Sequence, residues 1–238
     1  MQHIIDQLGD FGGTLVTDGY GAYEKFNKRN ENMTHAQCWV HSRRYFEKAL
    51  QLEPEAIAIA LAYIGLLYEH EKHIRDQQLE GQKKADYRSE NSKPIVEEFF
   101  GWCFEQRQRI DLVKSNPLSK ALAYVTKRES ELKVFLSDPD VPMDTNHLER
   151  ALRVIPMGRK NWLFCWTEIG GEHVGIIQSL LVSCRLHGVN PYEYLVDVLQ
   201  RVGSHPASKV EELTPRVWKE KFADNPLRSV IDGTFNKV

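Results

Sequence analysis

Two short runs of β-type residues near the N-terminal end predict strands. The first, Thr14 to Thr17, stops at Asp18-Gly19, a dipeptide typical of turns, so Asp18 is expected at the carboxyl end of a strand. MTHAQCWV predicts the second strand, and a short helix is expected between the two over about residues 22–27. HSRRYFEKALQL follows with helical spacing. Strand, helix, strand, helix predicts an α/β fold.

From residue 55 the hydrophobic pattern becomes helical. PEAIAIALAYIGLLYEHEKHIRDQQ predicts a long helix. KPIVEEFFGWCFEQRQRIDLV and PLSKALAYVTKRESELKVFL predict two more, each with a proline suited to a first helical turn. The polar segment from Gly81 to Ser92 predicts a loop. We therefore expect a helical block that interrupts the α/β framework and ends at the proline-containing linker DPDVPMD.

Beyond the linker, NHLERALR predicts a helix, and PMGRKNWLFCWTEIGG predicts short strand-like or irregular structure. EHVGIIQSLLVSCRLHG predicts a helix that ends at Gly188. NPYEYLVDVLQRVG predicts another, with Asn190 as its N-cap and Glu193 three residues later. The patterns divide the chain into a partial α/β core, a helical insertion, a returning helix with a basic segment, a C-terminal helical region and a polar tail: residues 11–54, 55–140, 141–165, 166–203 and 204–238.

Composition narrows the class of protein only slightly. Hydrophobic residues make up 42% of the 238 and the formal net charge is -2, which excludes a uniformly basic nucleic-acid coat but not a local basic patch. Four cysteines without a CxxC pair favour reduced thiols in a cytoplasm over a disulfide scaffold. No signal-peptide pattern is visible, and no stretch approaches the roughly 20 apolar residues that cross a bilayer. We expect a cytoplasmic protein without a membrane partner.

Two carboxylates are candidates for chemistry, and each also has an ordinary structural explanation. Asp18 stands at a strand end, where α/β folds place ligand-binding groups, but an aspartate before glycine also suits a turn. Glu149 lies three residues after Asn146, as in a capping box, and four before Arg153, as in a helical ion pair. Spacing alone favours a structural role for Glu149, with metal binding as the alternative.

The segment CWVHSRR holds further candidates. His35, Cys38 and His41 are three possible zinc ligands, but no companion pair supplies the fourth, so zinc is not favoured. Cys38 also suits a small buried hydrophobic position, and His41 a hydrogen-bonding position at a helix start. Arg43 and Arg44 could bind phosphate or be solvated.

The segment GRKNWLF combines two adjacent cations with Asn161 and Trp162. Such a segment could grip a nucleic-acid backbone or stack on an unpaired base, although Trp162 also suits an anchor in the core. The chain from 144 to 160 is locally basic. Its basic residues are Arg150, Arg153, Arg159 and Lys160.

These motifs follow one another in a specific order: TDGYGAY, CWVHSRRYF, D-x-N-x-x-E-R-x-x-R, GRKNWLF, GG, and the helices up to YEYLVDVLQRV. In this order they resemble the insertion-sequence-sixty-six (IS66) family of transposases from about Phe11 to Val202, the helical block being the least distinctive part. The resemblance implies a DDE-type catalytic domain with a ribonuclease-H-like fold. In such enzymes three carboxylates hold two Mg²⁺ ions, which activate a water or a 3′-hydroxyl for attack on a phosphodiester.

The resemblance also assigns roles to residues of this chain. Asp18 matches the family's second aspartate and Glu149 its glutamate. Cys38 and His41 match a Cys-x-x-His motif found between those carboxylates. The positions that match expected DNA contacts are Arg150, Arg153, Arg159 and Lys160.

The family's first aspartate has no match here, because the chain begins 17 residues before Asp18 and neither Asp6 nor Asp10 is suitably placed. We therefore expect a partial ribonuclease-H-like fold without its first strands, catalytically inactive by itself. Its expected partners are DNA and further copies of itself or a full-length transposase. The alternatives are a non-catalytic DNA-binding or regulatory fragment, a metal-dependent nuclease and, least favoured, a zinc-bound structural module.

Overall fold

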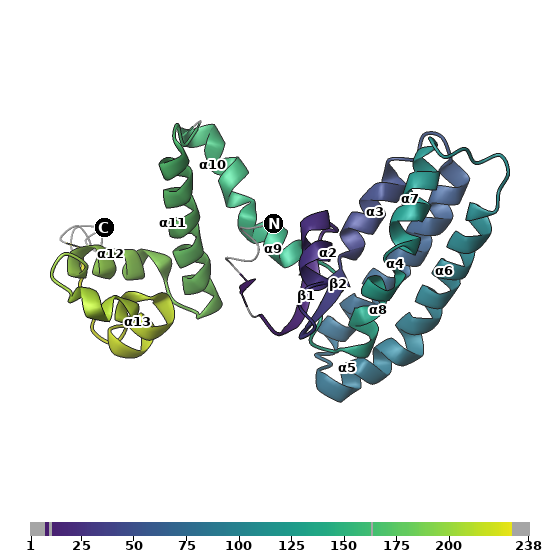
Figure 1. Ribbon diagram of the computed structural model, residues 1–238. Helices are drawn as coiled ribbons and strands as arrows, with labels where there is room; N and C mark the ends of the chain where they lie inside the picture. The colour runs from purple at the N-terminus through teal and green to yellow at the C-terminus, as the bar shows by residue number, and fades with distance from the viewer. Residues whose placement is uncertain (1–7, 10, 163, 230–238) are drawn as a thin grey trace, which may run out of the picture. The chain divides into compact units, whose positions relative to one another are not determined.

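The structure, a computed structural model, describes residues 8–9, 11–162 and 164–229 (Figure 1). Asp6 and Asp10 lie outside these residues. The chain divides into two compact units, Met1–Arg150 and Ala151–Val238.

The first unit contains a small parallel sheet. Strands β1 (Gly13–Thr17) and β2 (Met33–Gln37) pair in the register Gly13↔Met33 to Thr17↔Gln37. Helix α2 (Gly21–Asn27) connects them, and α3 (Trp39–Glu47) begins two residues after β2. The predicted strand–helix–strand–helix order is confirmed, and both strands end at the same edge of the sheet.

A helical block follows, as the hydrophobic pattern predicted. It contains α4 (Pro54–Asp76), α5 (Gly81–Tyr87), the π-helical turn η1 (Arg88–Ser92), α6 (Lys93–Arg107), α7 (Pro117–Thr126) and α8 (Glu129–Ser137). Figure 1 shows these helices packed together on one side of the two strands. Aromatic side chains fill their common core: Trp39, Phe46, Phe99, Phe100 and Phe135.

The sequence prediction was wrong at two places in this block. Gly81 to Ser92 is helical rather than a loop. The reason is tertiary, because the Arg88 side chain is fully buried and bonds to Glu71 and to three backbone carbonyls. The second error was to run one helix through residues 117–136. The chain leaves the helical conformation at Arg128 (φ −116°, ψ 21°), whose side chain binds carbonyls of Tyr124 and Gly19.

The segment before Glu149 also differs from the prediction. Helix α9 (Asn146–Leu152) begins with Asn146 as its first residue, and the carbonyl of Thr145 accepts from the Glu149 N–H at 3.0 Å. The Asn146 side-chain amide donates to the Asp144 carboxylate at 2.6 Å, so it does not act as the predicted cap. Helix α9 continues into the second unit.

In the second unit, α10 (Val154–Trp162) replaces the irregular structure predicted for PMGRKNWLF. Pro156 did not prevent this helix, because a proline in a first turn removes an N–H that has no helical partner there. Helix α11 (Glu168–Leu186) follows, and Gly188 has φ +63° just beyond its end, as predicted. Helix α12 (Pro191–Arg201) has the predicted cap, since the Asn190 side chain accepts from the Tyr192 N–H.

The segment after Ser204, predicted as a polar tail, adds the 3₁₀ helix η2 (Ala207–Leu213) and α13 (Pro215–Lys221). Trp218 from α13 packs with Cys184, Val189 and Tyr194 in the core of the second unit. The prediction missed these helices because the segment is mostly polar and contains few apolar residues that pack into the core. Within the part of the chain that is described, no helix combines the length and apolar character that crossing a bilayer needs.

Candidate active site

Asp18 follows β1 directly and is exposed. Its Oδ1 accepts from the Tyr20 N–H at 2.9 Å, and Gly19 has φ +83°, so the chain turns sharply at the strand end. Both explanations weighed for Asp18 describe it in part, because the carboxylate stabilises the turn and also stands at the edge where parallel strands end.

The residues at the start of α3 form hydrogen bonds with the segment that precedes α9, more than 100 residues further along the chain. The Cys38 N–H donates to the Thr17 carbonyl at 3.0 Å, which continues the pairing of the strands. The Cys38 sulfur then accepts from both the N–H and the hydroxyl of Thr145, at 3.3 Å each. The Trp39 N–H donates to the Met143 carbonyl at 3.1 Å. These bonds place the start of α9 beside the strand end from which Asp18 emerges.

Glu149, in the first turn of α9, faces α3. Its Oε2 accepts from Arg44 Nη2 at 2.8 Å, and this hydrogen bond raises the pKa of Arg44. Its Oε1 is buried, makes no hydrogen bond within the described structure, and lies 3.5 Å from Nε2 of His41. In the described structure Glu149 therefore pairs with Arg44, 105 residues away, instead of with Arg153, the partner that helical spacing predicted.

Beneath the turn, buried polar side chains line the sheet. The Thr17 hydroxyl lies 2.8 Å from Nε2 of His35, and the Gln37 amide donates to the same hydroxyl at 3.3 Å. Burial lowers the pKa of His35, which keeps its imidazole neutral near pH 7. These hydrogen bonds link the ends of the two strands, and the side chains that make them are uncharged.

The three possible zinc ligands have separate partners. His35 bonds to Thr17, Cys38 to Thr145, and His41 faces Glu149. Within residues 8–9, 11–162 and 164–229, no three side chains of His, Cys, Asp or Glu form a group that could hold a metal ion. In this structure the Cys-x-x-His motif binds protein groups.

Sequence reasoning missed Thr145 and gave no role to Asp144. The Asp144 carboxylate accepts from the backbone N–H of Asn146 at 2.9 Å, and burial with the nearby Asp144 raises the pKa of Tyr68. Asp144 opens the D-x-N-x-x-E run, which is a signal that could have found it. No local signal shows that Cys38 would bind Thr145.

The expected DNA-binding residues differ in their surroundings. Arg43 is paired with Glu47 in its own helix at 2.9 Å, and Arg44 with Glu149. Four residues of this set are exposed: Arg150, Arg153, Arg159 and Asn161. The guanidinium of Arg159 lies 5.6 Å from the centre of the Phe164 ring. The side chains of Lys160 and Trp162 lie outside what the structure describes.

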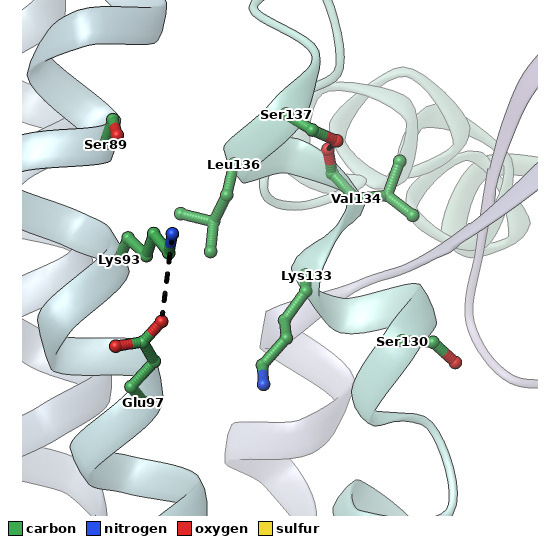
Figure 2. A pocket seen from close by; sticks show the side chains of 8 residues that line it. All are labelled: Ser89, Lys93, Glu97, Ser130, Lys133, Val134, Leu136 and Ser137. Atoms are coloured by element: carbon green, nitrogen blue, oxygen red, sulfur yellow. Dashed lines mark hydrogen bonds and ion pairs between the residues drawn. The ribbon is translucent and has the colours of Figure 1, made fainter.

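A separate open hollow of about 400 Å³ lies between η1–α6 and α8 (Figure 2). Its lysines are already paired: Lys93 lies 4.0 Å from Glu97, and Lys133 bonds to Glu129. The charge available for an anionic ligand is therefore small, and this hollow is a weaker candidate than the strand-end site.

Comparisons with known proteins agree with the order of motifs. Residues 1–173 match the family described as "Transposase IS66 family", and residues 179–216 match "IS66 C-terminal element". The chain belongs to the IS66 transposase family.

Related chains of Sinorhizobium fredii include the uncharacterized proteins y4hP, y4jD and y4qI. They are 29%, 32% and 30% identical to this chain over 93%, 90% and 92% of its length. The alignments cover 42%, 42% and 41% of those relatives, so this chain spans about two fifths of their length. No solved structure matches.

Proposed function

We propose that this chain supplies two of the metal-binding carboxylates, Asp18 and Glu149, of a DDE-type site for DNA strand transfer, within a core related to ribonuclease H. The observation that carries the proposal is the pair of hydrogen bonds from Thr145 to the Cys38 sulfur. They bring the helix that bears Glu149 to the strand end that bears Asp18. Membership of a transposase family supports the same reaction.

The side chains fit a hard divalent cation in part. Mg²⁺ prefers carboxylate oxygens, and Asp18 is exposed at a strand end. Glu149 Oε1 is a buried acceptor without a hydrogen-bond donor in the described structure, and a cation would satisfy it. A bound metal would activate the attacking hydroxyl and stabilise the leaving oxygen. The chain itself holds the carboxylates in place, with Arg44 fixing Oε2 of Glu149.

DNA is the proposed substrate, bound through phosphate contacts. The exposed arginines of the second unit are suited to such contacts, since a guanidinium binds phosphate in a bidentate manner. Arg44 could add a contact only if it exchanged Glu149 for phosphate. The proposed contact residues are Arg43, Arg44, Arg150, Arg153, Arg159, Lys160 and Asn161.

One observation favours a second function, DNA binding without catalysis. Arg44 donates to one oxygen of Glu149 and His41 lies 3.5 Å from the other, so protein groups already face both oxygens of the carboxylate. A regulatory chain that joins a complete transposase would need no more than this arrangement. On this hypothesis Glu149 is a structural partner of α3.

We expect binding to duplex DNA to weaken at least about tenfold between about 50 mM and 200 mM salt, because phosphate contacts release counterions. Glu149→Gln should not weaken the affinity, since it removes a negative charge and releases Arg44. Fluorescence anisotropy of a labelled duplex measures both effects. An affinity that does not change with salt, or that is lost in Glu149→Gln, would contradict the proposed DNA contacts.

The expectation that the chain alone is inactive stays a prediction. Incubation of the purified protein with supercoiled plasmid and Mg²⁺ tests it, with conversion to the nicked form as the measurement. Nicking that disappears in Asp18→Ala would overturn it and would place Asp18 in the catalytic machinery.

A further inference from the structure

We propose that Tyr124 and Arg128 of the helical insertion are positioning residues for Asp18, which they act on by holding the backbone of the Asp18–Gly19 turn. The inference rests on the role proposed for Asp18. It gives a function to the helices between Asp18 and Glu149, the part of the chain whose sequence is least distinctive.

The contacts with the turn come from one end of α7. The Tyr124 hydroxyl donates to the carbonyl of Asp18 at 3.0 Å, across 106 residues of sequence. Arg128 Nη2 donates to the carbonyl of Gly19 at 3.4 Å, while its Nη1 donates to the carbonyl of Tyr124 at 3.2 Å. Two consecutive carbonyls of the turn are therefore bonded to neighbouring side chains of the insertion.

A stack of cations and rings fixes the Tyr124 side chain. The Tyr45 and Tyr124 rings lie 4.0 Å apart at 16°, the Arg128 guanidinium lies 4.1 Å from the Tyr124 ring, and Lys48 Nζ lies 4.7 Å from the Tyr45 ring. Such contacts are attractive because the ring face carries negative charge density. With its ring held on both faces, Tyr124 has little rotational freedom left to lose when its hydroxyl bonds to the turn.

The Tyr124 hydroxyl stays a donor over the working pH range. Burial raises the pKa of Tyr124 to about 12, with the nearby Arg128 opposing the shift. Coulombic interaction with Tyr45 and Asp18 also favours the protonated form of this hydroxyl. The bond to the Asp18 carbonyl is therefore not interrupted by ionisation near neutral pH.

Tyr124 and Arg128 together form a clamp on the Asp18–Gly19 turn, and the turn fits closely against it. A Cβ added at Gly19 would lie 2.5 Å from the Tyr124 hydroxyl oxygen and 3.1 Å from Oε1 of Gln37, and Gly19 has φ +83°. Only glycine combines that conformation with that space. The backbone of the turn is therefore held at two carbonyls and packed against Tyr124, so Asp18 can move only by rotation about its side-chain torsions. One of its carboxylate oxygens also accepts a hydrogen bond from the Tyr20 N–H.

Tyr124→Phe tests the inference because it removes the hydroxyl and keeps the ring stack and the net charge. Two quantities are measured on the full chain: the dissociation constant for Mn²⁺, from the paramagnetic resonance of the free ion, and the NMR chemical shift of the Tyr20 amide. We expect Mn²⁺ binding to weaken about three- to tenfold, the effect of one net hydrogen bond. The Tyr20 amide should shift, because it bonds to the Asp18 carboxylate.

The control is Tyr63→Phe, which removes a hydroxyl from α4, where the Tyr63 ring packs on Phe99, 6.2 Å between centroids. It should change neither quantity. Arg128→Met serves as the second variant and should shift the Tyr20 amide in the same way.

The outcomes separate the two proposals. If Asp18→Asn weakens Mn²⁺ binding while Tyr124→Phe changes neither the affinity nor the Tyr20 amide, the clamp is overturned and the proposed metal role stands. If Asp18→Asn does not alter Mn²⁺ binding, the proposed function fails. The Tyr20 amide then decides the clamp alone: a shift in Tyr124→Phe beyond that of the control supports it, and none overturns it.

Discussion

Arg88→Met is expected to lower the free energy of unfolding of the first unit by about 3–5 kcal/mol, the cost of leaving half of a buried ion pair. The Arg88 side chain is fully buried and binds both oxygens of Glu71, at 2.7 and 2.8 Å. Its Nη1 also donates to the carbonyls of Phe135, Asp138 and Val141. The substitution removes all of these bonds and leaves the carboxylate of Glu71 without its partner.

The effect should extend to the candidate site. The carbonyls that Arg88 binds belong to the end of α8 and to the segment that leads to Met143 and Thr145. Hydrogen exchange of α8 amides at increasing urea concentration measures the stability of this unit separately from the second.

Two further variants make the Arg88 prediction specific. Arg75→Met, at an exposed position of α4, should change stability by less than about 0.5 kcal/mol. Arg88→Met combined with Glu71→Met should recover much of the loss, since replacing both members of a buried pair leaves no unpaired charge. A loss below about 1 kcal/mol in the single variant would contradict this account of Arg88.

Asp197→Asn should destabilise the second unit by about 2–4 kcal/mol, because a buried acceptor of several donors is lost. Asp197 is fully buried in α12 and accepts from the Trp218 indole at 2.9 Å, from the Leu227 N–H at 2.6 Å and from Arg201. The carboxylate therefore joins α12, α13 and the chain beyond α13. Hydrogen exchange of α12 amides at increasing urea concentration measures the loss separately from the first unit.

This contribution should depend on pH in a defined direction. Burial alone would raise the pKa of Asp197, but the bonds from Arg201, Trp218 and Leu227 outweigh it and lower the pKa. A carboxylate with a lowered folded-state pKa adds stability above its unfolded pKa, about 3.9, and loses it as the pH falls through the folded value.

The stability difference between the wild type and Asp197→Asn should therefore be full at pH 7 and shrink below about pH 4. Asp224→Asn, at an exposed position, is the matched control. A difference that stayed constant down to pH 2 would contradict the assignment of the effect to the ionised carboxylate.

Local patterns predicted the strands, α4, and the cap at Asn190, because each depends on residues that are neighbours in the sequence. The turn at Asp18-Gly19 was predictable for the same reason. The π-helical turn at Arg88 and the break at Arg128 were missed, since both depend on side chains that bind carbonyls far along the chain. Helix α10 was missed although its proline, Pro156, lies in the first turn, where a helix tolerates proline.

The sequence predicted which residues belong to the candidate site but not the contacts that they make. The order of the motifs identified Asp18 and Glu149, but spacing favoured a cap for Glu149. The structure instead shows an ion pair with Arg44, and a cysteine that binds Thr145 across 107 residues. Such pairings depend on how the chain returns to the sheet, which no local pattern encodes. The ribonuclease-H-like relationship and the metal stay predictions.

The most direct test of the central claim is whether Asp18 and Glu149 form one cation site. Mn²⁺ dissociation constants would be measured for the wild type, Asp18→Asn, Glu149→Gln and the double variant. We expect each single change to weaken binding about tenfold or more, and the double variant to be little weaker than the singles, because residues that share one ligand are not additive. Effects that multiply, or single changes without effect, would contradict a shared site.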